Sequence, residues 1–334
     1  MIEIRQNGAV VRWAGLFTWV AALAGCATVP LRPGADLPPP APAVPPAEPA
    51  GESTPEPVHV AILVSDDLPV YTATAAALER RLGDDRYTTF SLHGDETGGE
   101  RIVAQLARTG AKRLVTIGLL ATRAGRRYSD LPMVFCQVFN YSDDGLIGST
   151  SGGVNLLPPF ADQLRVWKQI SPKLRRVGVI VGPNQNELIA RATESAREQQ
   201  VELISRVVNS DREAVYVFKR LVPRIDGLWL LPDNRILSPQ VIREIMTYAS
   251  KHQRQVVVFN PNLLNLGGLM SVSGRESDVA EQVVAILDSR DGEGIVPRPS
   301  MTPLTELRVE INPRAARELG LSIPATLARY LRRD

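Results

Sequence analysis

The chain has 334 residues, 44% hydrophobic residues and a formal net charge of +2. About 280 residues follow the proline-rich tract described below, which is near the upper limit for one hydrophobic core and favours two globular lobes. Basic residues gather only in short clusters (Arg123, Arg126, Arg127; Arg175, Arg176), which we interpret as solvated faces. The chain therefore lacks the basic stripe of a nucleic-acid-binding protein.

The first 25 residues have the pattern of a signal peptide. Arg5 and Arg12 precede an apolar, uncharged stretch at 14–25, which is shorter than the about 20 apolar residues of a membrane-spanning helix. It ends in LAGC at 23–26, which resembles the lipobox of bacterial lipoproteins. The resemblance implies cleavage before Cys26 and its modification by acyl chains such as palmitate, two or three of which give lasting membrane attachment. The alternative is that Cys26 is an ordinary apolar residue of a cleaved signal or anchor helix.

A proline-rich tract extends to residue 57. Eleven prolines lie between Pro30 and Pro57, mostly with Ala, Gly and Glu between them. No large apolar residue repeats at a helical or strand period, so the tract cannot bury enough surface to fold. We predict a lipidated cysteine and a disordered, extended spacer at 26–57. A ligand for a partner's aromatic groove is the alternative for this tract.

Beyond the tract, short apolar runs alternate with helix-like segments. Strands are predicted at 58–64, 87–92, 113–117, 132–139, 175–181, 201–205, 227–231, 255–259 and 267–274, and helices at 73–82, 99–108, 161–170, 187–199, 212–221, 239–252 and 278–288. Such alternation indicates parallel sheets covered on both faces. GSTSGG at 148–153 is interpreted as a break between two series. The predicted fold class is α/β, with two doubly wound parallel-sheet lobes.

The end of the chain departs from this alternation. The segment 295–301 is extended and marked by prolines, and 305–312 alternates like an edge strand. A capped helix is predicted at 313–321, with Asn312 as N-cap and Gly320 just beyond the last turn. A short last helix is expected from Pro324.

Five stretches resemble one family in the same order. They are LPMVFCQVF at 131–139, GGVN at 152–155, ISPKLRRVGVIVGPNQNE at 170–187, DGLWLLPDNRILS at 226–238 and INPRAARELGLSIPATLARY at 311–330. The set resembles the ABC transporter substrate-binding family that includes tryptophan-binding lipoproteins. The resemblance implies a type I periplasmic-binding-protein fold, with a central cleft between two lobes joined by three crossings. It assigns 58–158 and about 264–292 to the first lobe, and 159–263 and about 300–334 to the second.

Polar residues follow most of the predicted strands. In parallel sheets, ligands lie beyond the carboxyl ends of strands, near helix N-termini. Hydroxyls and helix amides suit a ligand carboxylate, an acid suits an ammonium, and Tyr141 suits an aromatic ring or closes the cleft. An amino acid is therefore the expected ligand class, although the same residue types also cap helices and form turns. The predicted ligand-binding residues are Ser65, Asp66, Ala121, Thr122, Asn140, Tyr141, Asn184, Asn186, Asp233, Asn234 and Asn260.

Asp233 is the strongest of these candidates. It matches the family's Asp-Asn loop, where the resemblance implies an amine-binding acid. Two other loops depart from the family pattern, since 119–121 reads Leu-Leu-Ala in place of Thr-Pro-Ala, and 140–141 reads Asn-Tyr in place of Asp-Pro. We therefore expect an aromatic amino acid as the ligand, although two of the loops that face the ligand in this family differ in this chain.

The sequence gives little support for catalysis. GSTSG at 148–152 has Thr150 where a nucleophile elbow requires serine, and no lysine follows as in a phosphate-binding loop. His59, His93 and His252 are far apart and lack metal-ligand spacing, and Cys136 is expected to pack as a small buried residue. We predict a protein that is not an enzyme and that has no cofactor and no metal.

Two functions fit these observations. The first is a solute-binding lipoprotein of an ABC importer in the bacterial cell envelope, facing the periplasm, with a small-molecule ligand, an ABC permease as partner and no nucleic acid. The second is an outer-membrane lipoprotein of the same fold that binds and regulates a protein partner such as a cell-wall synthase. The in-order family resemblance favours the first function, which is our prediction. The long spacer and altered loops favour the second function. Ala27 favours it too, because an aspartate after the lipidated cysteine is the usual inner-membrane retention signal.

Overall fold

The computed structural model describes residues 59–142, 145–289 and 300–332. The predicted signal peptide, Cys26 and the proline-rich spacer lie outside the described residues. Within the described ranges, no helix has both the length and the apolar character needed to cross a membrane.

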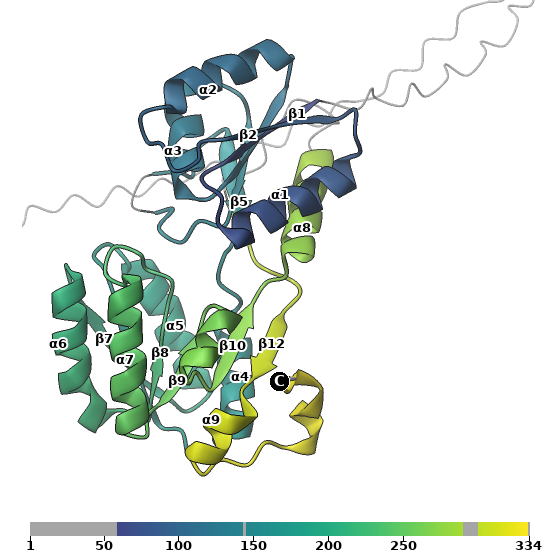
Figure 1. Ribbon diagram of the computed structural model, residues 1–334. Coiled ribbons are helices and arrows are strands. Elements are labelled where there is room, and N and C mark those ends of the chain that lie inside the picture. Colours follow the sequence, from purple (N-terminus) through teal and green to yellow (C-terminus); the bar gives the residue numbers. More distant parts are fainter. Residues whose placement is uncertain (1–58, 143–144, 290–299, 333–334) are drawn as a thin grey trace, which may run out of the picture. The chain divides into compact units, whose positions relative to one another are not determined.

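The first lobe is built on a fully parallel six-stranded sheet with the order β11-β5-β4-β3-β1-β2 (Figure 1). Its strands are β1 (Val60–Val64), β2 (Tyr87–Ser91), β3 (Arg113–Ile117), β4 (Met133–Cys136), β5 (Ser151–Val154) and β11 (Met301–Thr302). Helices α1 (Pro69–Leu82) and α8 (Glu276–Asp288) pack on one face, and α2 (Gly99–Leu106) and α3 (Leu119–Tyr128) pack on the other. Because both faces are covered, the central strand β1 is buried along its whole length.

The second lobe has a sheet with the order β12-β10-β9-β8-β6-β7, in which only the edge strand β12 is antiparallel. Its strands are β6 (Arg176–Val181), β7 (Glu202–Val207), β8 (Gly227–Trp229), β9 (Gln255–Val258), β10 (Met270–Ser273) and β12 (Arg308–Ile311). The cluster on one face includes residues of α4 (Phe160–Ile170), α5 (Asn186–Glu198) and α9 (Pro313–Glu318). Helices α6 (Asp211–Leu221) and α7 (Pro239–Lys251) cover the other face.

Three chain segments connect the two lobes. They join β5 to α4 at 155–159, β10 to α8 at 274–275, and β11 to β12 at 303–307. Two doubly wound sheets with three connections are the arrangement that the sequence predicted. The fold class is therefore confirmed.

The predicted assignment of the late segments to the lobes was wrong in two places. The segment at about 264–292 was expected in the first lobe, but β10 pairs with β9 and β12 in the second sheet, and only α8 packs in the first lobe. The segment from about 300 was expected in the second lobe, but β11 pairs with β5 in the first sheet. The strand β10 therefore belongs to the second lobe and the strand β11 to the first. Pairing between strands that are distant in the sequence determines both assignments.

Two elements of the first lobe were missed. The supposed break at 148–153 overlaps the strand β5. In this strand Gly153 lies so close to β4 that a Cβ atom on it would overlap the carbonyl oxygen of Phe135. The glycine therefore serves close strand packing and does not mark a turn. Helix α3 begins directly after Gly118, whose φ of +86° allows the sharp turn out of β3.

The local signals near the carboxyl end are confirmed. The Asn312 side chain accepts hydrogen bonds from the backbone nitrogens of Arg314 and Ala315, each at 3.1 Å, and so caps α9. Gly320 has a φ of +66°, the left-handed conformation expected just after a helix. The last predicted helix is a 3₁₀ segment at Ala325–Tyr330.

Candidate functional site

A cavity of about 840 Å³ lies between segments of both lobes. The first lobe contributes the amino end of α1 and the segment that follows β4, and the second contributes the segments that follow β8 and β9. All three crossings also contribute to the wall. The cavity therefore sits where the carboxyl ends of two sets of parallel strands face one another, which is the usual ligand position in such sheets, and its volume is typical of small-molecule sites.

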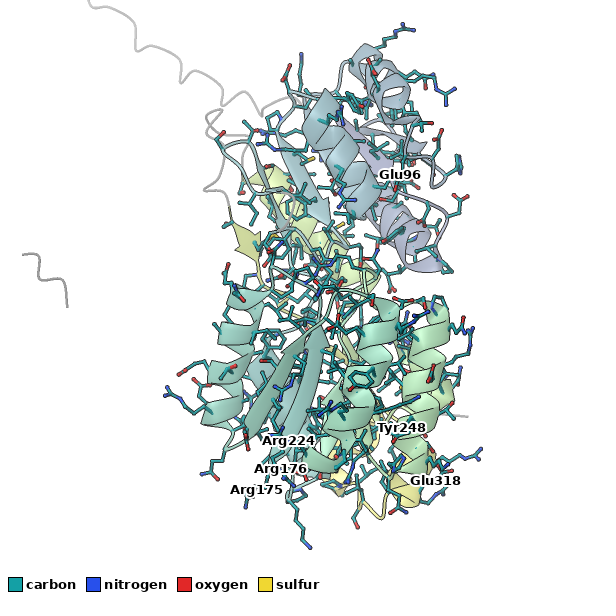
Figure 2. All side chains as sticks on the ribbon, turned by 90° about the vertical axis from the view of Figure 1, so that its left-hand side faces the viewer. Glu96, Arg175, Arg176, Arg224, Tyr248 and Glu318 are labelled. Carbon is teal, nitrogen blue, oxygen red and sulfur yellow. The ribbon has the colours of Figure 1, made fainter. Side chains whose placement is uncertain are left out.

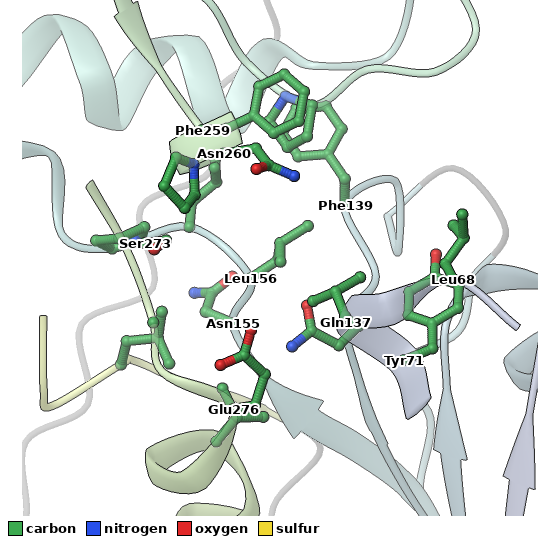
Figure 3. A pocket seen from close by; sticks show the side chains of 18 of the residues that line it. Leu68, Tyr71, Gln137, Phe139, Asn155, Leu156, Phe259, Asn260, Ser273 and Glu276 are labelled. Atoms are coloured by element: carbon green, nitrogen blue, oxygen red, sulfur yellow. The ribbon is translucent and has the colours of Figure 1, made fainter. Parts of the chain in front are cut away.

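The cavity wall combines apolar side chains with amides, as Figure 3 shows. Phe139, Leu156 and Phe259 supply apolar surface, while Gln137 and Asn155 present amide groups on the side of Leu156 away from the two phenylalanines. Such a wall can hold an apolar body and orient it through a few hydrogen bonds.

Four of the predicted ligand-binding residues line this cavity. They are Asn140, Asp233, Asn234 and Asn260. Three others line a smaller cavity of about 420 Å³, which shares the wall formed by Phe139 and 155–158; they are Tyr141, Asn184 and Asn186. The structure therefore divides these seven residues between two neighbouring cavities.

The remaining four predicted residues, Ser65, Asp66, Ala121 and Thr122, line neither cavity. The buried Ser65 Oγ accepts a hydrogen bond from the Ala121 backbone nitrogen at 2.9 Å, and the Thr122 hydroxyl donates to the Gly118 carbonyl at 2.7 Å. Asp66 Oδ1 accepts from the Leu68 nitrogen at 2.8 Å. These contacts fix the first turns of α3 and the entry to α1, and a ligand contact of the four residues stays a prediction.

Asp233 lies in the wall of the larger cavity, but its carboxylate is already fully engaged. The residue has 0% exposure, and Arg235 donates to its two oxygens from Nε at 2.8 Å and from Nη2 at 2.7 Å. The Gly182 backbone nitrogen donates a third bond at 2.8 Å. The expectation of a free acid for a ligand ammonium is thus not met at Asp233, because the guanidinium two residues along the chain takes that role.

The same contacts keep Asp233 ionised. Burial raises the pKa of its carboxyl, but the hydrogen bonds and charge of Arg235, together with the Gly182 nitrogen, outweigh burial and hold the pKa below its ordinary value. The pair is consequently neutral as a unit and offers the cavity no net charge.

A second set of contacts ties the first lobe to this pair. Asn140, in the segment after β4, donates from Nδ2 to Asp233 Oδ1 at 3.4 Å and accepts from Gln185 Nε2 at 2.9 Å. The preceding Phe139 is buried in the core cluster of the second lobe, next to residues of α4 and β8. Asn140 therefore acts as a contact between the lobes, and its role at a ligand stays a prediction.

The sequence missed several cavity residues, including Tyr71, Gln137, Asn155 and Glu276. Gln137 has a φ of +59°, a left-handed conformation that such residues seldom adopt and that turns the chain from β4 toward the second lobe. Glu276 was left outside the predicted helix at 278–288, although α8 begins with it. A search for first-turn acids at the crossings would have found Glu276, whereas the conformation of Gln137 leaves no signal in the sequence.

The groups weighed for catalysis are dispersed. The His59 ring bonds the Thr88 hydroxyl, His93 pairs with Asp67, and His252 packs against the Tyr248 ring. Over the described part of the chain, no set of three His, Cys, Asp or Glu residues could hold a metal ion. Cys136 is fully buried, and this burial raises its pKa to about 12.

One cluster of basic residues in the second lobe lies far from the cavity in the fold. Arg175, Arg176 and Arg224 are exposed near the amino ends of β6 and β8, and they gather at the lower end of Figure 2. Arg176 contacts Asp226 at 3.8 Å. This cluster forms a solvated surface at the edge of the sheet opposite to the cavity.

Comparisons with known proteins agree with this geometry. A family model described as "ABC transporter substrate binding protein" matches residues 85–332. A solved ABC domain from Streptococcus pneumonia in complex with L-Trp has 18% identity and a TM-score of 0.62, covering 82% of this chain and 98% of its own.

Two further solved structures show the same likeness. The ligand-free, open substrate-binding protein CD0873 from Clostridium difficile, described as having adhesive properties, has 16% identity and a TM-score of 0.64 (82% and 98% covered). A periplasmic ribose ABC transporter protein from Conexibacter woesei has 12% identity and a TM-score of 0.54 (84% and 99% covered). At these identities the likenesses establish the fold alone. No curated protein matches the chain.

Proposed function

Because the chain belongs to the ABC transporter substrate-binding protein family, we propose that it is the solute-binding component of an ABC importer. One observation carries this proposal, namely the cavity of about 840 Å³ that both lobes wall at the carboxyl ends of their strands. Closure of the lobes around a solute would then be the working motion. The protein binds its solute without chemistry and delivers it to a permease.

We propose an amino acid or a close relative as the solute. The apolar surface of Phe139, Leu156 and Phe259 suits an apolar side chain, and the nearby amides suit polar ends. The L-Trp bound to the Streptococcus protein supports an aromatic member of this class. Asp233 is no longer the amine partner in this proposal, since Arg235 neutralises it.

We further propose that Cys26 carries the lipid anchor and that the tract at 26–57 spans the distance from the membrane to the lobes. The support is the lipobox-like LAGC at 23–26 and the proline content that follows. Labelling with a palmitate analogue tests this point. Incorporation that disappears in Cys26→Ser supports the anchor, and equal incorporation in that variant contradicts it.

A thermal-shift screen of amino acids and amines tests solute binding. A ligand present at 100 times its Kd stabilises the folded protein by about 2.7 kcal/mol, which raises Tm by several degrees. Ser273→Trp places an indole ring in the cavity and should abolish the shift, because Ser273 lines it. Ser277→Trp, at an exposed position of α8, is the matched control and should keep the shift.

The result of this screen decides between the two functions. A ligand whose effect disappears in Ser273→Trp alone supports solute binding, and the discovery of permease and ATPase genes beside the gene of this chain would then favour import. A screen without any binder would overturn the proposal. Capture of a cell-wall synthase in that case would support the outer-membrane alternative.

A further inference from the structure

Among the described residues, three charged side chains line the larger cavity, namely Asp233, Glu276 and Arg308. Their partners decide what charge a bound solute meets. Asp233 is neutralised by Arg235 at 2.7 Å. Arg308 contacts Glu310 Oε1 at 2.6 Å, two residues along β12. Both charges are therefore balanced within the protein.

Glu276 differs from these two residues. No hydrogen bond or ion pair joins its carboxylate to any residue in 59–142, 145–289 or 300–332, and the side chain is only partly exposed. Figure 3 shows the carboxylate directed between Asn155 and Gln137, toward the apolar side chain of Leu156. One unpaired negative charge thus remains in the cavity wall.

The position of Glu276 in its helix suits an acidic side chain. Glu276 is in the first turn of α8, where the backbone N–H groups and the helix dipole favour a negative charge. The crossing at 274–275 places this turn at the junction of the lobes. A solute between the lobes would therefore contact Glu276 while it contacts Phe139 and Phe259 on the other side.

We propose that the cavity selects solutes that carry a positively charged amine, with Glu276 as the counter-ion. This inference rests on the proposed solute-binding function and specifies its substrate class. A primary amine with an apolar body satisfies the wall fully, because its ammonium meets Glu276 and its body meets the aromatic side chains. An amino acid pairs its amine in the same way, but its carboxylate finds no unpaired cation among the described residues of the wall. A solute whose only charge is negative meets Glu276 unpaired and is rejected.

Two series of probes that keep the apolar body and change only the charge test this inference. The first consists of tryptamine, L-tryptophan and indole-3-propionate, and the second of isoamylamine, L-leucine and 4-methylpentanoate. Titration calorimetry should show that the amine binds most tightly and the acid most weakly in the series that fits the cavity.

Glu276→Gln keeps the size and removes the charge. It should weaken binding of the amine by about tenfold to a hundredfold, the range for a hydrogen bond to a charged group. Glu281→Gln is the matched control, because Glu281 lies on the same helix, is 64% exposed and pairs with Arg81 outside the cavity. Its affinities should equal those of the unchanged protein, and the Tm of each free variant shows that both fold.

The outcomes separate this inference from the function on which it rests. Equal amine affinity in Glu276→Gln, or tighter binding of the acid than of the amine, overturns the charge selection and leaves solute binding in place. If no probe binds but the wider screen finds an anionic solute, the charge selection is likewise overturned and solute binding is kept. Absence of any binder overturns both.

Discussion

Replacement of Arg235 by methionine should destabilise the protein strongly, because it leaves a buried carboxylate without its counter-ion. Asp233 has 0% exposure, and Arg235 supplies two charge-assisted hydrogen bonds at 2.8 and 2.7 Å. Methionine keeps the apolar stem but leaves the carboxylate with the backbone nitrogens of Gly182 and of position 235 and with the longer contact to Asn140. Loss of one partner of a buried ion pair costs about 3–5 kcal/mol. The Arg235 side chain is 29% exposed, so water replaces part of it and we expect about 3 kcal/mol.

Urea unfolding followed by circular dichroism measures this loss. Arg197→Met is the matched control, because Arg197 forms an exposed pair with Glu194 and its loss should cost less than about 1 kcal/mol. The double variant Asp233→Asn with Arg235→Met removes the stranded charge and should recover about half of the loss. A cost below about 1 kcal/mol for Arg235→Met, or a double variant no more stable than the single one, would refute the reasoning.

The dependence on pH gives an independent test of the same pair. The pKa of Asp233 is below its ordinary value in the folded protein because the bonds from Arg235 and Gly182 outweigh burial. Its contribution to stability is therefore fully present above the pKa of the unfolded carboxyl, about 3.9, and is lost as the pH falls from there through the folded pKa. The free energies of unfolding of the unchanged protein and of Arg235→Met should therefore become more similar as the pH falls through this range. A constant difference would mean that the loss has another origin.

Two further predictions concern the first lobe. Gly153→Ala should lower the free energy of unfolding, measured with urea, by about 3 kcal/mol, because the new Cβ would overlap the Phe135 carbonyl of β4. Gly148→Ala is the control and should cost far less, since its Cβ meets the movable end of Arg126. Equal losses in the two variants would show that strand packing does not require Gly153. Cys136, whose pKa burial raises to about 12, should resist iodoacetamide at neutral pH until the protein unfolds, since the thiolate is the reactive form. Mass spectrometry of the peptide that contains it measures this, and rapid labelling of the folded protein would contradict the burial.

Local chemistry made much of the fold predictable. Buried strands such as β1 and β6 read as continuous apolar runs because helices cover both faces of each sheet. The Asn312 cap and Gly320 are visible in the sequence because each acts on its own helix. The lobe that takes β10 was not predictable in this way. The strand β10 pairs with β9 and β12, but the sequence gives no sign that it prefers them to the edge strands of the first lobe.

The candidate site was predictable in position but not in charge. The rule that ligands lie beyond strand ends led to Asn140, Asp233, Asn234 and Asn260, which do line the cavity. The same rule included Ser65, which caps α3 instead. A sequence shows which residues follow a strand, but it does not show which of their polar groups are already bonded within the protein.

The contacts of Asn140 bear on how the lobes can move. The segment after β4 starts in the first sheet, yet Phe139 packs in the core of the second lobe and Asn140 bonds both Asp233 and Gln185 there. This segment is therefore a fourth attachment between the lobes, beside the three crossings. Opening of the cavity must either withdraw Phe139 from that core or bend the chain between Cys136 and Phe139, and truncation of such a core aromatic costs about 3–5 kcal/mol. Bending is the easier route, and Gln137, at a φ of +59°, is the residue that lies at the bend. The bend therefore lies just before Asn140, whose bonds hold the segment to the second lobe, while Glu276, in the first turn of α8, is the charged side chain that we propose for the solute.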